Sequence, residues 1–150
     1  MSLDAWNTNG WLREYRTSRQ EATDILGLAE RDLKDAARQE ISTDWRFNIA
    51  YNAGLQLATL VLFSAGYRTG RGKSWHYRVI QALPLVMGSD FNVVRDYLDN
   101  CRRKRNVSEY DAAGTISKKE VGDLLDLVLN LKNQVEKWLR ENHPDLISAK

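Results

Sequence analysis

The chain has 150 residues, of which 43% are hydrophobic and 28% charged, and a formal net charge of +2. This length suits one domain, and the composition excludes a disordered chain. The small positive charge neither requires nor excludes a nucleic-acid partner, so the placement of the charges matters more than their sum.

Cysteine use and hydropathy predict a cytoplasmic protein. The one cysteine, Cys101, cannot form an internal disulfide, and the chain begins without the basic segment and apolar run of a signal peptide. Residues 47–67 carry no charge, but the dense apolar run within them covers only residues 57–63. A membrane span needs about 20 predominantly apolar residues, so we expect a buried central helix here.

Hydrophobic periodicity predicts a helical chain after an N-terminal extension at residues 1–17. Capping-box pairs, Ser18 with Glu21 and Ser117 with Glu120, mark two of the helix starts. Gly88 ends one helix, and the polar segment 106–115 is predicted to be a loop. The expected helices cover residues 18–38, 43–67, 75–87, 90–105 and 117–141.

Short connections between successive helices favour antiparallel neighbours. The sequence therefore predicts an all-α fold: one domain over residues 1–150, an up-down antiparallel bundle of four to five helices with its core at about 18–141. Along the second helix runs a polar seam, Asn48, Asn52, Gln56 and Thr59. Hydrogen bonds between helices explain this seam better than contacts with a ligand.

The up-down topology also predicts a basic pole. In this topology one end of the bundle holds the ends of the second and fourth helices and the starts of the third and fifth helices. The basic side chains gathered there would form a phosphate-binding surface. Basic residues in the last turn of a helix also complement its dipole, which is the alternative explanation for residues 102–105. The residues expected at this pole are Arg13, Arg16, Arg19, Arg68, Arg71, Lys73, His76, Arg78, Arg102, Arg103, Lys104, Arg105, Lys118 and Lys119.

Two sequence features resemble a P-loop and a metal site but lack the spacing that those sites need. The glycine-rich loop from Gly66 to Gly72 is one residue too long for a P-loop and follows a helix instead of a strand. The two histidines, His76 and His143, have no Cys or carboxylate partners at metal-ligand spacing, so neither a metal site nor a cofactor is expected. For His76, at the start of the third helix, a structural role and a functional role are both open.

The segment Arg105-Asn106-Val107-Ser108-Glu109-Tyr110 resembles the Arg-Asn-x-x-x-His motif of HEPN domains, which are helical bundles. The upstream segments 48–53 (Asn-Ile-Ala-Tyr-Asn-Ala) and 66–68 (Gly-Tyr-Arg), followed by His76, are similar to the corresponding helix and loop of small stand-alone members. The resemblance covers roughly residues 43–138.

The resemblance implies a catalytic set of Arg105, Asn106 and Tyr110. In active ribonucleases of the family, the Arg and His act on an RNA phosphodiester without a metal, usually across a dimer interface. Arg105 would hold the phosphate, and Asn106 would fix the loop or contact the same phosphate. Tyr110 stands where the family has His, and a phenol is a poor general base at neutral pH.

The sequence therefore predicts a HEPN-like domain that binds RNA or a nucleotide, as a homodimer. The phosphate-binding residues predicted for it are Arg68, Arg71, Lys73, His76, Arg102, Arg103 and Lys104. One alternative is a metal-independent endoribonuclease of the toxin or defence type. The other is a protein-interaction module whose partner is a nucleotidyltransferase or an antitoxin.

Overall fold

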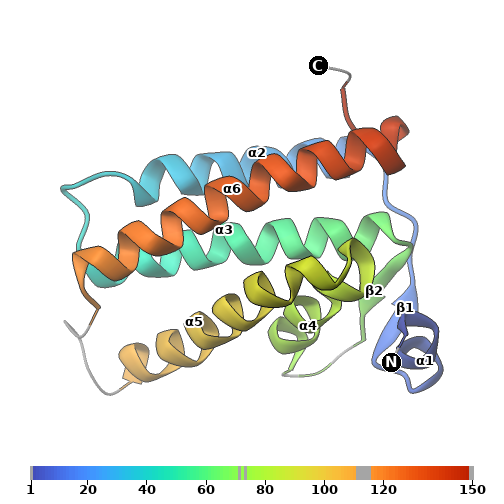
Figure 1. Cartoon of the computed structure of the whole chain (residues 1–150), viewed down its shortest axis with the longest axis horizontal. Coiled ribbons are helices and arrows are strands. Elements are labelled where there is room, and N and C mark those ends of the chain that lie inside the picture. Colours follow the sequence, from blue (N-terminus) through green and yellow to red (C-terminus); the bar gives the residue numbers. More distant parts are fainter. Residues whose placement is uncertain (1, 71, 73, 111–115, 149–150) are drawn as a thin grey trace.

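The computed structural model describes residues 2–70, 72, 74–110 and 116–148, without the side chains of residues 106–110. These residues form α-helices, two short strands and two 3-10 turns, which confirms the predicted all-α class (Figure 1). The elements are α1 (Leu3–Thr8), β1 (Leu12–Glu14), α2 (Arg19–Ala36), α3 (Thr43–Ser64), β2 (Tyr67–Thr69), α4 (Trp75–Met87), η1 (Ser89–Phe91), α5 (Asn92–Tyr110), α6 (Lys118–Asn142) and η2 (Pro144–Leu146).

Helix boundaries follow from local hydrogen bonds. At the start of α6, Ser117 Oγ accepts from the Glu120 amide at 3.1 Å, and Glu120 Oε1 accepts from the Ser117 amide at 3.1 Å, so the predicted capping box is complete. Ser18 Oγ likewise accepts from the Glu21 amide, but the Glu21 carboxylate accepts from the Tyr15 hydroxyl instead. Gly88 ends α4 with φ 108°, a conformation that favours glycine.

The central helix of the bundle is α3, with α2, α5 and α6 around it (Figure 1). Its side chains are buried on several sides, including Phe47, Tyr51 and Leu57. Gly54 allows the neighbouring helices to come close, because a Cβ at this position would lie 3.1 Å from Leu98 of α5 and 3.3 Å from Val128 of α6. The uncharged stretch 47–67 is thus a core helix that ends in a strand, and no helix in the described residues meets the length and hydropathy of a membrane span.

The N-terminal segment is structured, in contrast to the predicted extension. β1 pairs with β2 in antiparallel register, with Leu12 opposite Thr69 and Arg13 opposite Arg68. Trp6 of α1 and Leu12 of β1 are buried in the core. Each strand has only three residues, too few for an alternating pattern to show in the sequence.

The predicted basic pole is wrong, because the chain is threaded differently. α4 has 13 residues against 22 in α3, so it spans about 20 Å instead of about 33 Å. It begins beside the middle of α3, and α5 makes the antiparallel return along α3 (Figure 1). The end of α5 and the start of α6 therefore lie where α3 begins, not where it ends.

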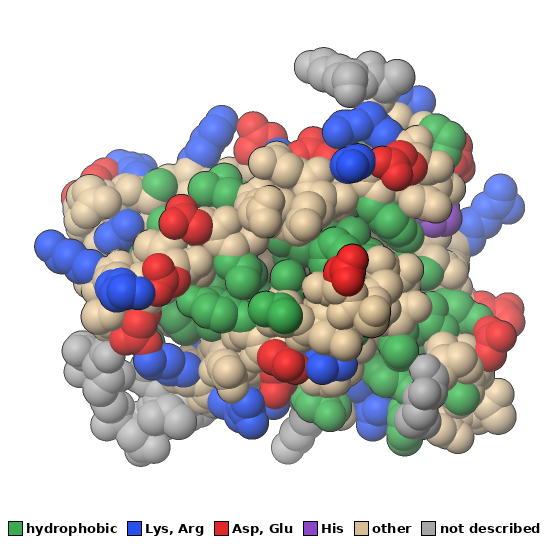
Figure 2. Space-filling model, viewed as in Figure 1, with side chains coloured by type: hydrophobic (Ala, Val, Ile, Leu, Met, Phe, Trp, Pro, Cys, Tyr) green, Lys and Arg blue, Asp and Glu red, His purple; other side chains and the backbone are tan. Residues whose placement is uncertain are grey.

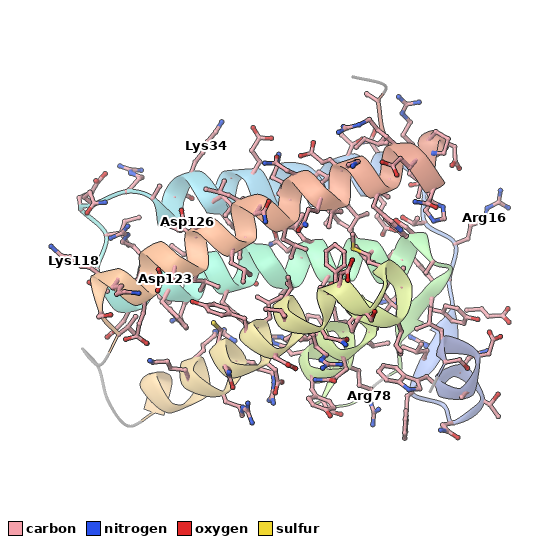
Figure 3. The ribbon with its side chains drawn as sticks, in the orientation of Figure 1. Arg16, Lys34, Arg78, Lys118, Asp123 and Asp126 are labelled. Carbon is pink, nitrogen blue, oxygen red and sulfur yellow. The ribbon has the colours of Figure 1, made fainter. Side chains whose placement is uncertain are left out.

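The positions of individual basic residues also show that they do not gather at one end. Lys118 and Arg16 lie at opposite ends of the molecule (Figure 3). Arg78 lies over the Trp11 ring, with its Cζ 4.1 Å from the ring centroid. Acidic and basic side chains are interspersed over the face seen in Figure 2, and neither end of it is purely basic.

The polar seam of α3 is in part a structural network. Asp32 of α2, 5% exposed, accepts from Asn52 Nδ2 at 3.1 Å and from Gln56 Nε2 at 3.2 Å. Its other oxygen accepts from the Arg31 guanidinium at 2.9 Å. For Asn52 and Gln56, the expected hydrogen bonding between helices is confirmed. Residues Arg31, Asp32, Asn52 and Gln56 are called the Asp32 network below.

Candidate functional site

Three helices bring aromatic, imidazole and guanidinium groups together beside the middle of α3. His76 lies in the first turn of α4, and its Nδ1 is 3.3 Å from Tyr51 Oη of α3. Arg105 of α5 lies over the Tyr51 ring, with its Cζ 5.5 Å from the centroid. Arg102, one turn earlier in α5, lies over the Tyr77 ring at 5.4 Å. We call Tyr51, His76, Tyr77, Arg102 and Arg105 the arginine–histidine cluster.

Helical geometry explains why only part of the basic run 102–105 reaches this cluster. Residues three apart lie on the same helix face, so Arg102 and Arg105 both face α3 and α4. Arg103 points to solvent, with 62% of its side chain exposed and an ion pair to Asp99 at 3.5 Å. Lys104 pairs with Glu120 in the first turn of α6.

The helix dipole does not account for this basic run. The predicted helix ended near residue 105, but α5 continues to Tyr110, so residues 102–105 lie inside it. Their carbonyls are not those of the last turn, where basic residues complement the dipole. The loop predicted from residue 106 is wrong for residues 106–110, whose backbone is helical.

One carboxylate, Asp99, lies next to the arginines of α5. Arg102 Nε donates to Asp99 Oδ1 at 2.9 Å, and that carboxylate is nearly buried. Asp99 also pairs with Arg103, so a single carboxylate serves two guanidinium groups. Arg105 lies against the face of an aromatic ring, which attracts a cation.

This environment keeps the His76 imidazole neutral. Burial lowers the pKa of His76, and the positive charges of Arg105 and then Arg102 lower it further. Burial also raises the pKa of Tyr51, so its phenol stays protonated near neutral pH. A neutral imidazole beside two guanidinium groups can accept a proton, or it can hydrogen-bond a phosphate held by the arginines.

Cys101 lies beside Arg102 in the sequence but takes no part in the cluster. Its side chain is 6% exposed, and burial raises the pKa of its thiol to about 12. Because the thiolate is the reactive form, this cysteine is an unreactive core residue.

The structure thus brings together only some of the predicted site residues. His76, Arg102 and Arg105 lie around Tyr51 and Tyr77, whereas Arg68 lies on β2 and contacts the rings of Tyr15 and Phe63. Arg71 and Lys73 lie outside the described residues, as do the side chains of Asn106 and Tyr110.

Prediction from the sequence missed the roles of Tyr51, Tyr77 and Asp99. Tyr51 belongs to the segment 48–53 used for the family resemblance, but nothing in the pattern tied it to His76. The signal for Asp99 was its spacing of three residues from Arg102 within one helix, which places the two side chains on one face.

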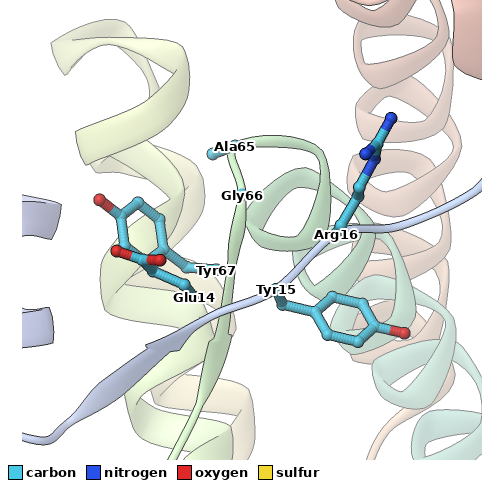
Figure 4. Close-up of a pocket in the computed structure, with 6 residues that line it drawn as sticks. All are labelled: Glu14, Tyr15, Arg16, Ala65, Gly66 and Tyr67. Atoms are coloured by element: carbon cyan, nitrogen blue, oxygen red, sulfur yellow. The ribbon is translucent and has the colours of Figure 1, made fainter.

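A pocket of about 450 Å³ beside the strands is a poor candidate for the site. Glu14 and Tyr67 project to one side of the crossing chain segments, whereas Tyr15 and Arg16 project to the other (Figure 4). The two phenols are already used, since Tyr67 donates to Asp4 at 2.6 Å and Tyr15 donates to Glu21 at 2.8 Å. Its polar groups therefore do not converge on one ligand.

The arginine–histidine cluster is thus the best-supported candidate site of the described residues. Comparisons of the chain with protein-family models, with curated proteins and with solved structures find no significant match.

Proposed function

We propose that the chain is a HEPN-like domain that binds RNA, and that it holds an RNA phosphate at the arginine–histidine cluster. The observation that carries the proposal is that His76 and Arg105 both contact Tyr51, while Arg102 lies over the ring of Tyr77, the residue next to His76. Two guanidinium groups one helical turn apart can donate to one phosphate, and the charge-assisted bonds they form are stronger than neutral ones.

The aromatic groups of the cluster support the same function. Tyr77 and Trp75 of α4 are 42% and 40% exposed, beside the arginines and His76. Exposed rings next to cations can stack on unpaired bases, which is how single-stranded RNA is commonly bound. A phosphate at the arginines and a base against Trp75 or Tyr77 would use both kinds of contact.

Fluorescence anisotropy with a labelled single-stranded RNA 12-mer, in EDTA, tests this proposal. We expect affinity to fall as salt rises, because binding releases counterions. Arg105→Gln should weaken binding about tenfold or more, since a charge-assisted contact is lost. Arg103→Gln is the matched control, with the same charge change on the exposed side of α5. Equal losses in both variants would contradict a specific site at the cluster.

A second candidate function, cleavage of RNA without a metal, is favoured by the position of His76. In this reaction the 2′-hydroxyl oxygen bonds to phosphorus while a base takes its proton, and the bond from phosphorus to the 5′-oxygen breaks as that oxygen takes a proton from water. If Nδ1 donates to Tyr51 Oη, the neutral His76 keeps Nε2 as that base. Arg105 would stabilise the charge on the phosphate.

An RNase assay in EDTA decides between binding and cleavage. Cleavage by the wild type that is lost in both Arg105→Gln and His76→Gln, while RNA binding persists in His76→Gln, would establish the enzyme. Salt-sensitive binding without cleavage would leave the binding function. Tyr110→Phe separates the two candidate bases, since it should abolish cleavage only if the residue at the family's His position acts in the reaction.

We also propose that the domain forms a homodimer. Large apolar side chains on α4 and α5 are exposed, including Leu85 and Val93 at 40% and 74%. Among the tryptophans, Trp45 and Trp75 are also exposed, whereas Trp6 is buried. A monomeric mass by light scattering at micromolar concentration would contradict the dimer.

Co-purification with a nucleotidyltransferase or an antitoxin would instead favour the alternative that the domain is a protein-interaction module.

A further inference from the structure

A second cavity, of about 640 Å³, lies between the two strands, α3 and α4. This volume is in the range of pockets that hold small molecules. Its apolar floor includes Leu62 and Val79, which are 1% and 2% exposed. Aromatic rings of Phe63 and Trp75 form part of its wall. We call this cavity the ribbon pocket.

Two arginines line the same pocket from the strands. Arg13 and Arg68 are partners in the antiparallel pairing of β1 with β2, so their side chains leave the same face of the ribbon. Like charges directly opposite each other on a ribbon are destabilising. Among the described residues, neither arginine has an ion pair with a carboxylate that offsets this repulsion.

An anion between the two guanidinium groups would remove the repulsion and form charge-assisted hydrogen bonds with both. The rest of the ligand would face an apolar floor and aromatic walls, which offer large contact area and ring stacking. The small share of charged groups in the lining, confined to the strand side, favours a ligand with one anionic end and one apolar end.

We propose that the ribbon pocket binds a small molecule with a planar aromatic ring system and one anionic group, either an aryl carboxylate or a nucleoside monophosphate. The anion lies between Arg13 and Arg68, and the ring lies against Trp75 and Phe63. This site is separate from the arginine–histidine cluster, since its cations come from the strands and not from α5. Trp75 lines the ribbon pocket, and its ring centroid is 4.1 Å from that of His76, so it borders both sites.

Isothermal titration calorimetry with matched probes tests the ligand chemistry on the full chain. Indole-3-acetate carries both features, indole-3-acetamide lacks the charge, acetate lacks the ring, and AMP tests the phosphate source. We expect indole-3-acetate or AMP to bind, and the neutral amide and acetate each to bind about tenfold or more weakly than indole-3-acetate. AMP as the tighter ligand would identify a nucleotide. Equal binding of acetate and indole-3-acetate, or no binding of either ring anion at millimolar concentration, would overturn the proposal.

Arginine-to-glutamine variants test whether the ligand binds in this pocket. Arg13→Gln and Arg68→Gln should each weaken binding about tenfold. Because Arg68 also contacts Tyr15 and Phe63, Arg13→Gln is the decisive variant if Arg68→Gln loosens the ribbon. Arg140→Gln, on the exposed side of α6, should leave binding unchanged. Loss of binding in Arg105→Gln but not in Arg13→Gln would assign the ligand to the arginine–histidine cluster and refute the ribbon pocket, even if the RNA proposal holds.

Discussion

Two polar clusters lie against α3 and use consecutive residues of it, Tyr51 and Asn52. In the Asp32 network, a buried carboxylate accepts from Asn52 and Gln56 on one oxygen and from Arg31 on the other. In the arginine–histidine cluster, two guanidinium groups lie over aromatic rings beside a neutral imidazole. The first cluster is centred on one buried carboxylate, whereas the second is centred on two guanidinium groups and two aromatic rings.

The difference separates a structural role from a binding role. A carboxylate whose oxygens are all occupied has no capacity left for a ligand, and it fixes α2 against α3. Guanidinium groups, by contrast, are the donors that proteins commonly use to hold a phosphate. Disrupting the Asp32 network should therefore change stability, and disrupting the arginine–histidine cluster should change binding.

The largest expected effect on stability is that of Asp32→Ala. Asn52 and Gln56 would lose their shared buried acceptor, so we expect the free energy of unfolding to fall by about 3 kcal/mol. Urea denaturation followed by circular dichroism measures it. Asp24→Ala, which removes an exposed carboxylate on the same helix, should cost no more than about 0.5 kcal/mol. Equal losses in the two variants would show that the Asp32 network stabilises the fold no more than an exposed carboxylate does.

For Arg105→Ala we expect a large loss of RNA affinity and a small loss of stability. RNA affinity should fall by about 1.5–3 kcal/mol, because a charge-assisted contact to phosphate is lost. Stability should change less than in Asp32→Ala, since Arg105 is only partly buried whereas Asp32 is buried. Anisotropy and urea denaturation on the same sample separate the two effects. A stability loss as large as that of Asp32→Ala would make Arg105 a structural residue.

Prediction from the sequence succeeded where the signal is local. Ser117, Glu120 and Gly88 mark helix ends through hydrogen bonds and backbone conformation within a few residues, and the structure has them as expected. His76 and Arg105 were also singled out from local motifs, and both contact Tyr51. The end of α5 was misplaced because residues 106–110 are mostly polar and show no apolar periodicity.

Features that depend on distant parts of the chain were not predictable in this way. The basic pole failed because the length of α4 and its crossing beside Tyr51 decide which helix makes the return along α3. The pairing of β1 with β2 joins residues more than fifty positions apart through three-residue strands. Neither the direction of α4 nor that pairing leaves a periodic trace in the sequence.

A smaller effect is expected for Tyr51→Phe. The change removes the hydrogen bond to His76 Nδ1 and keeps the ring under Arg105, so stability should fall by about 1 kcal/mol while RNA affinity stays nearly constant. Tyr97→Phe on α5 is the control, since its hydroxyl makes no hydrogen bond among the described residues. A large loss of RNA affinity in Tyr51→Phe would show that the hydroxyl, through His76, contributes to binding.

The smallest expected effect is on the titration of His76. Its pKa lies below the ordinary 6.5 because of burial and the charges of Arg105 and Arg102. As pH falls below about 6.5, the unfolded chain takes up this proton before the folded one does, so His76 lowers the free energy of unfolding at acid pH. His76→Gln should therefore reduce the loss of stability between about pH 7 and pH 5.

Proton NMR titration of the imidazole tests the cause directly. A His143→Gln variant leaves one histidine signal, which assigns His76. Arg105→Gln on that background removes a nearby positive charge and should raise the pKa of His76 toward its ordinary value, whereas Arg103→Gln, on the exposed side of α5, should change it less. If both substitutions move the pKa equally, the field at His76 comes from the whole basic run of α5, and the pairing of His76 with Arg105 is not specific.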